Sequence, residues 1–170
     1  MLRMPHDGSR SRRKGDLRFF TRNWVQGDMT DEEADAVMRQ YGRRIEDLKL
    51  PPSARELADL NPHDGYIREV KHEPASHELG LALRCGDAQR GYCDTCLRFS
   101  GVEISQEHLA ILLAARRPAA FEILCGEIDR VSAGLLEYRL LLHPTGEVAI
   151  RFSGIAVTRC PAAGRHTHAR

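Results

Sequence analysis

The sequence predicts an α+β fold, in which N-terminal helices are followed by a mostly antiparallel sheet of about six strands with one inserted helix. Apolar residues between positions 30 and 60 recur every three or four residues, which is the period of an amphipathic helix. From Gly65 onward they alternate with a period close to two, as in half-buried strands. The chain has 170 residues, 42% of them hydrophobic, so it is long enough for one domain with its own core.

Two helices are predicted in the first third of the chain. Thr30 and Glu33 have the spacing of a capping box, and further acidic residues follow in the first turn, where they interact favourably with the helix dipole. This helix is expected to end before Pro51. Ser53 is expected to cap a second, short helix that closes before Pro62.

The rest of the domain is predicted to consist of strands separated by Pro and Gly turns, with one helix from Ser105 to Arg117 between the third and the fourth strand. The predicted strands are residues 66–72, 77–85, 92–99, 121–129, 135–143 and 147–152. The cations at the end of the inserted helix interact favourably with its carbonyl end, so they need no functional explanation.

The last two strands are predicted to form a hairpin with Gly146 at positive φ. In the expected register Leu140 lies opposite Ile150 and Tyr138 opposite Phe152, so one face is apolar and is buried against the helices. The other face is expected to carry both charged and apolar side chains and to be covered by water or by a partner. On this face Arg139 is expected to lie across from Arg151. The face holds Glu137, Arg139, Leu141, Ala149 and Arg151.

Charge divides the chain into three parts. Residues 1–15 carry a formal charge of +4 and are predicted to be a disordered basic arm, and residues 161–170 a disordered tail. The domain between them, residues 16–160, has 18 basic and 23 acidic residues, a formal charge of −5. Such an acidic domain argues against nucleic acid as the main partner. The four cations between Arg10 and Lys14 in the basic arm are expected to bind nucleic acid only weakly.

The sequence predicts a cytoplasmic protein without a membrane partner, since it has neither a bilayer-spanning apolar run nor the apolar core of a signal peptide. Five cysteines, an odd number, are expected to be reduced thiols. Cys93 and Cys96 have the spacing of a redox pair or of half a zinc site. Residues three apart on a strand point to opposite faces, so the expectation is two structural thiols and no metal or cofactor.

His63 and Asp64 resemble the metal-ligand pair of the HD phosphohydrolases, but here they precede a predicted strand instead of lying on a helix. The simpler interpretation is an aspartate that bonds turn amides beside an exposed histidine. A metal-dependent hydrolase that uses this pair and nearby carboxylates is kept as an alternative. His72 and His77 flank a turn and form a weaker candidate ligand set with Cys85.

Several short motifs carry a family resemblance. They are RFFTRNW at 18–24, HD at 63–64, GV at 101–102, EID at 127–129, EYRLLL at 137–142 and PTGE at 144–147. Over residues 17–155 the chain resembles a family of small bacterial proteins, a domain of unknown function that occurs mostly as a stand-alone chain. The resemblance implies the α+β fold and transfers no catalytic residue. The basic arm and the Cys93-x-x-Cys96 motif depart from the family's usual form.

The function expected from these observations is a non-enzymatic protein-binding module, with an immunity-type inhibitor of a bacterial toxin as one version of it. Phosphate-binding loops, Gly-x-Ser-x-Gly elbows and His-Glu-x-x-His helices do not occur, so no catalytic residue is predicted. Acidic side chains attract a basic partner at long range. The partner-binding candidates are Asp31, Glu32, Asp35, Glu137, Arg139 and Arg151, and the acids Glu122, Glu127 and Asp129 are expected on a solvated face. Nucleic-acid binding through the basic arm is the remaining alternative.

Overall fold

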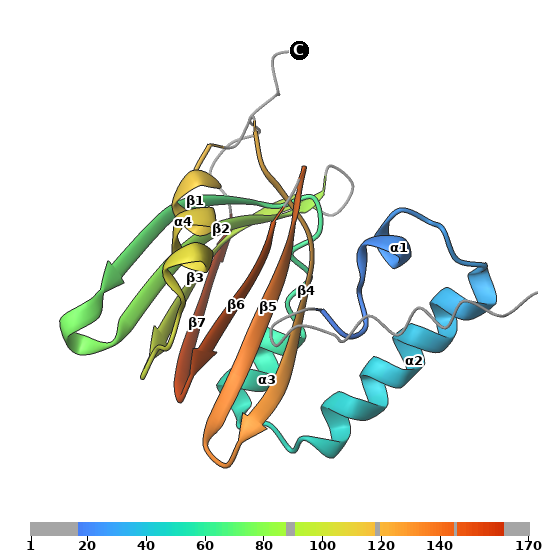
Figure 1. Ribbon diagram of the computed structural model, residues 1–170, viewed down its shortest axis with the longest axis horizontal. Coiled ribbons are helices and arrows are strands. Elements are labelled where there is room, and N and C mark those ends of the chain that lie inside the picture. The colour runs from blue at the N-terminus through green and yellow to red at the C-terminus, as the bar shows by residue number, and fades with distance from the viewer. Residues whose placement is uncertain (1–16, 88–90, 118–119, 145, 162–170) are drawn as a thin grey trace, which may run out of the picture.

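The computed structural model describes residues 17–87, 91–117, 120–144 and 146–161 (Figure 1). The predicted basic arm and the tail beyond residue 161 therefore lie outside the described residues. In chain order the elements are α1 (Arg22–Val25), α2 (Asp31–Asp47), α3 (Pro52–Ala58), β1 (Tyr66–Glu73), a 3₁₀ helix (Pro74–Ser76), β2 (Glu78–Asp87), β3 (Gly91–Ser100), α4 (Gln106–Ala114), β4 (Glu122–Ser132), β5 (Leu135–His143), β6 (Glu147–Phe152) and β7 (Gly154–Pro161).

The described strands form two antiparallel sheets, one in the order β1-β2-β3-β7 and the other in the order β4-β5-β6. The predicted α+β class is confirmed, with helices first, antiparallel strands after them and one inserted helix. The strand β7 was not predicted. It pairs with β3, more than fifty residues earlier, and such a distant pairing leaves no mark on local periodicity.

The main core lies between the two sheets. Phe99 of β3 packs against Tyr138 of β5 and Phe152 of β6, with ring centroids 6.3 and 5.0 Å apart. Leu57 of α3 and Leu112 of α4 complete the same cluster. Burial of these apolar side chains is the main force that holds the sheets together. The hairpin face expected to pack on helices therefore packs largely on a second sheet.

Two of the three helix N-caps predicted from the sequence are found in the structure. The Thr30 hydroxyl accepts a hydrogen bond from the Glu33 N–H and the Glu33 carboxylate accepts one from the Thr30 N–H, which completes the predicted capping box. Ser105 caps α4 as expected. The predicted cap at Ser53 is wrong, because the cap is Pro51 and α3 begins at Pro52, two residues earlier than predicted. Proline is favourable at this first position, where a backbone N–H would have no partner within the helix.

The β5–β6 hairpin forms, but its register differs by two residues from the prediction. Tyr138 lies opposite Ile150, and Leu140 opposite Val148. Five residues, 142–146, lie between the last paired residues, where a three-residue turn was expected. A shift of two preserves the faces, so the predicted apolar face is buried as expected. Gly146 has the predicted positive φ, +140°.

The other face of the hairpin is not an open surface, contrary to the prediction. The segment 17–25 and α2 lie over this side of the β4-β5-β6 sheet (Figure 1). Glu137 and Arg139 are only 2% and 5% exposed. Arg139 lies opposite Ala149, and Arg151 lies opposite Glu137, so the expected pairing of two arginines does not occur. Alternation assigns residues to faces but does not say which segment covers each face.

The described part of the chain has no helix that is both long and apolar enough to cross a membrane.

Candidate functional site

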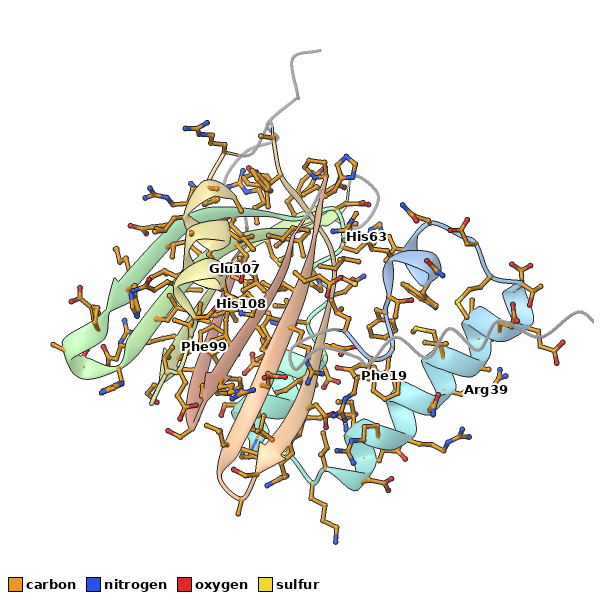
Figure 2. The ribbon with its side chains drawn as sticks, viewed as in Figure 1. Phe19, Arg39, His63, Phe99, Glu107 and His108 are labelled. Carbon is orange, nitrogen blue, oxygen red and sulfur yellow. The ribbon has the colours of Figure 1, made fainter. Side chains whose placement is uncertain are left out.

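A groove with a volume of about 530 Å³ lies along the outer edge of β4. One wall is formed by aromatic and aliphatic side chains of the segment 17–25 and of α2. The other wall is formed by α3 and the connection from α3 to β1, and the floor is the start of β4. Figure 2 shows Phe19, which neighbours this wall, between α2 and the sheet. Side chains that line the groove include Phe20, Trp24, Met38, Tyr41, His63 and Cys125.

The aromatic wall is a packed unit. The Phe20 ring lies with its centroid 4.8 Å from that of Trp24 and 4.8 Å from that of Tyr41. The Tyr41 hydroxyl accepts a hydrogen bond of 2.9 Å from the N–H of Ile128 on β4, and burial raises the pKa of this phenol above its usual value. Met38 stands on the same helix as Tyr41 and is 51% exposed. The wall is thus fixed by packing, while its rim offers apolar surface to solvent.

The backbone of β4 is open to the groove over a short stretch. The Ile123 N–H bonds the Gly65 carbonyl at 2.7 Å, and the Ile128 N–H bonds Tyr41, so both groups point away from β5. In a regular antiparallel ladder alternate residues point the same way, which directs the N–H and C=O of Gly126 outward as well. No hydrogen bond joins these groups of Gly126 to another described residue outside the ladder. Between the positions occupied by Gly65 and Tyr41, Gly126 therefore offers one N–H and one C=O to a bound extended segment.

Glu127 holds the aromatic wall in place. Its buried carboxylate accepts hydrogen bonds from the backbone N–H groups of Arg18 (2.7 Å), Phe19 (3.0 Å) and Phe20 (3.4 Å). It also accepts one from the Arg139 guanidinium at 2.9 Å. A buried carboxylate needs such donors, because an unpaired charge is strongly disfavoured inside a protein. One side chain of β4 thereby fixes the path of the segment 17–25.

Asp129 anchors α2 in the same way. Its carboxylate, which is buried, accepts hydrogen bonds from Arg44 of α2 at 2.7 and 3.0 Å and from Arg18 at 2.7 Å. The prediction that Glu127 and Asp129 lie on a solvated face is wrong. Both acids alternate with apolar residues as on a half-exposed strand, but the N-terminal segment and α2 cover them.

Glu137 completes a network of buried charges on this face. It accepts hydrogen bonds from Arg139 and, at 2.8 Å, from Arg151. Burial alone would raise the pKa of Glu137, but the hydrogen bond from Arg151 and the charge of Arg139 outweigh it, and the pKa is lowered. Three of the family-like motifs, at residues 18–24, 127–129 and 137–142, meet in this network. Their role here is structural.

The predicted partner-binding residues fall into two separate groups. Asp31, Glu32 and Asp35 are exposed at the start of α2, and binding of a basic partner there stays a prediction. Asp31 lies thirteen residues before Arg44, the residue through which α2 joins the buried network. This separation is roughly 20 Å along the helix. Of the other three predicted residues, Glu137 and Arg139 are buried in that network, and Arg151, with a side chain 25% exposed, faces solvent.

A cluster of carboxyl and imidazole groups lies beside the groove. The His63 Nδ1 is 2.9 Å from a carboxylate oxygen of Asp64, whose backbone has a positive φ of 58°. Glu122 lies near Asp64, and the pKa of Glu122 is raised, first by burial and then by hydrogen bonding to the Asp64 carboxyl. His143 lies opposite Glu122 in the β4–β5 ladder. The sequence singled out the first pair, but gave no signal that the strand 135–143 brings His143 to it.

The histidine and cysteine ligand sets considered from the sequence do not assemble. His72 and His77 line a different cavity of about 560 Å³ together with His108. Cys85 lies seven residues along β2 from Glu78, roughly 23 Å from that turn, so it does not join the two histidines in a ligand set. Within the described ranges, no three His, Cys, Asp or Glu side chains are arranged to hold a metal ion.

Comparison of the chain with protein-family models, with curated proteins and with solved structures finds no match. The structure itself is a small α+β protein, as the family resemblance implies. The groove and the cluster beside it are therefore the features of the molecule from which a function can be inferred.

Proposed function

We propose that this protein is a protein-binding module that holds an extended segment of its partner in the groove along β4. The observation that carries the proposal is the open backbone of β4 at Gly126, between two walls of side chains. Strand addition of this kind takes its affinity from main-chain hydrogen bonds, and its specificity from pockets for alternate side chains. The aromatic wall supplies such a pocket.

The surroundings of the groove define the chemistry of the partner. Phe20, Trp24 and Met38 favour an aliphatic or aromatic side chain on one face of the bound segment. Exposed acids on the same helix as Met38, among them Glu46 at the groove, favour lysine or arginine next to that anchor. A basic toxin bound by an immunity-type inhibitor is one partner with these features, and the identity of the flanking genes tests that special case.

The test uses the full chain and random linear peptides displayed on phage. We expect the selected peptides to carry an apolar anchor next to basic residues. Titration calorimetry should then show that Met38→Asp weakens binding of a selected peptide about tenfold, or by about 1.4 kcal/mol. Full burial of a methionine side chain contributes about 1.5 to 3 kcal/mol, and about half of Met38 remains to be buried by a peptide. Met38 is half exposed, so the substitution leaves the fold intact.

Leu113→Asp is the matched control, because Leu113 is 40% exposed on α4, away from the groove. It should leave the affinity unchanged. Hydrogen exchange of the Gly126 amide should slow on peptide binding, since strand addition gives this N–H an acceptor. Equal losses of affinity in the two variants, or an exchange rate at Gly126 that does not respond to peptide, would contradict the proposal.

A second candidate function, metal-assisted hydrolysis, is supported by one observation, the proximity of the Asp64 and Glu122 carboxyl groups, which raises the pKa of Glu122. Two carboxyl groups in contact share a proton, and a divalent cation can replace that proton. His63 and His143 flank the pair and are the residue types that would serve as further ligands or as general bases. A side-chain rearrangement is needed, since the described residues form no ready metal site.

Glu122→Gln tests the shared proton through the pH dependence of stability. A carboxyl group with a raised pKa stabilises the fold below its ordinary pKa, and this contribution is lost as the pH rises through the higher value. The variant keeps a hydrogen-bond donor to Asp64 without the second charge. We therefore expect it to match the wild type near pH 4 and to be more stable at pH 8 by up to about 1 kcal/mol in urea unfolding.

The same pair of proteins tests the metal. If a cation replaces the proton, added Mn²⁺ should raise the melting temperature of the wild type and not that of Glu122→Gln. If Mn²⁺ leaves the melting temperature of both proteins unchanged, the hydrolase proposal loses its support. If the free energies of unfolding of the two proteins differ by the same amount at pH 4 and at pH 8, the shared proton is contradicted.

A further inference from the structure

Two cysteines that are eight positions apart in the sequence face each other across neighbouring strands. Cys85 of β2 is the direct partner of Cys93 in the antiparallel β2–β3 ladder. Cys85 is 1% exposed, on the face of β2 that carries Leu83 and points into the core. Cys93 is partly exposed and packs against the same core. The pair therefore lies on one face of one sheet, at the border between core and solvent.

The hydroxyl of Thr95 lies next to the Cys93 sulfur, with the Thr95 Oγ1 3.7 Å from the Cys93 Sγ. Hydrogen bonding by Thr95 also moderates the raised pKa of Cys85. Directly opposed residues of an antiparallel pair have Cβ atoms about 4.5 to 5.5 Å apart, and a disulfide needs about 3.5 to 4.5 Å. A local movement of about 1 Å thus brings the two sulfur atoms to bonding distance.

The other cysteines do not compete for Cys93. Cys160 of β7 lies opposite Asp94, the neighbour of Cys93, and therefore on the other face of the sheet from Cys93. Cys96 lies opposite Ala82 and is exposed on the other face of the sheet, as the spacing on a strand requires. Cys125 belongs to the second sheet and is buried, with its Sγ donating a hydrogen bond of 3.3 Å to the Phe20 carbonyl. The ladder, and not the Cys93-x-x-Cys96 spacing, decides which thiols meet.

We propose that Cys85 and Cys93 are a redox-active pair, which a low-molecular-weight disulfide oxidises to a cross-strand disulfide. Cys93 reacts first because solvent reaches it. It loses its proton to water, and its thiolate attacks one sulfur of the small disulfide, which releases one small thiolate and leaves a mixed disulfide on Cys93. Cys85 then loses its proton and attacks the Cys93 sulfur, which releases the second small thiolate. Two protein thiols are oxidised, and one small disulfide is reduced to two thiols.

The environment of the two thiols explains this order. Burial raises the pKa of Cys85 to about 12, and the neighbouring Cys93 adds to the rise. A thiol with so high a pKa is a poor first nucleophile in solution near neutral pH. Once Cys93 carries the mixed disulfide, the Cys85 sulfur is held directly across from the sulfur it must attack, so proximity offsets its low reactivity.

The test uses the full chain, oxidised glutathione as the probe and peptide mapping as the readout. Reduced protein is incubated with oxidised glutathione, free thiols are alkylated, the monomer is isolated and then digested with trypsin. Cleavage after Arg84, Arg90 and Arg98 places Cys85 and Cys93 in separate peptides, 85–90 and 91–98. We expect these two peptides to be joined by a disulfide, with Cys125 and Cys160 alkylated.

Two serine variants assign the bond, since the peptide 91–98 also contains Cys96. In Cys96→Ser the linked peptides should form as in the wild type. In Cys93→Ser they should be lost. Cys93 is partly exposed, so this variant is expected to fold, and circular dichroism checks that it does. Linked peptides in Cys93→Ser would identify Cys96 as the partner and overturn the proposal, as would their absence from the wild type when no reduced glutathione is present.

Discussion

Arg139→Met is expected to destabilise the protein by about 3 to 5 kcal/mol, because it leaves two buried carboxylates without their shared counter-charge. Arg139 bonds both Glu127 and Glu137, and each of these acids is at most 2% exposed. Methionine fills a similar volume, so the loss reports on charge and not on a cavity. Urea unfolding at pH 7 measures it.

Two comparisons make the Arg139→Met result specific. Arg151→Met removes a partially exposed bond to Glu137 alone and should cost only about 1 kcal/mol. The loss in Arg139→Met should also shrink as the pH falls. The pKa of Glu137 is lowered in the fold, so its contribution is present above the ordinary carboxyl pKa and is lost as the pH falls through the lowered value. A loss that is independent of pH, or equal in the two variants, would show that the network does not act as inferred.

Phe20→Ala is expected to destabilise the protein by about 3 to 5 kcal/mol, the usual effect of truncating a buried phenylalanine. Phe20 is 7% exposed. It packs against Trp24 of its own segment and joins the segment 17–25 to α2 through Tyr41. Its loss removes packing that covers Leu141 and the outer face of the β4-β5-β6 sheet. Urea unfolding gives the stability, and faster hydrogen exchange along β4 should show the loosened cover.

Met38→Ala is the control for Phe20→Ala, since Met38 lines the same groove but is 51% exposed. Its effect should stay within about 0.5 kcal/mol. If Phe20→Ala were equally mild, the segment 17–25 would not be docked on the sheet in solution. The aromatic wall, and with it the proposed binding groove, would then lose its basis.

Local chemistry in the sequence predicts much of the fold. The Thr30 capping box, the Ser105 cap, the period-two strands and the positive φ of Gly146 each depend on residues within a few positions of one another. The faces of the β5–β6 hairpin were predicted even though its register was wrong by two residues, since a shift of two keeps every side chain on its face. The division into two sheets and the strand β7 depend on pairings with distant residues, and the sequence did not predict them.

In the candidate site, too, local features were predictable from the sequence, whereas contacts between distant segments were not. The sequence by itself determined which side chains share a face, including the alternation of Glu127, Asp129, Glu137 and Arg139 with apolar neighbours. Only the tertiary structure decided that this face is buried, that Glu122 meets Asp64, and that Cys93 faces Cys85 and not Cys96. The physical reason is that periodicity follows from backbone geometry over a few residues, whereas the segment that covers a face is chosen by packing across the whole chain.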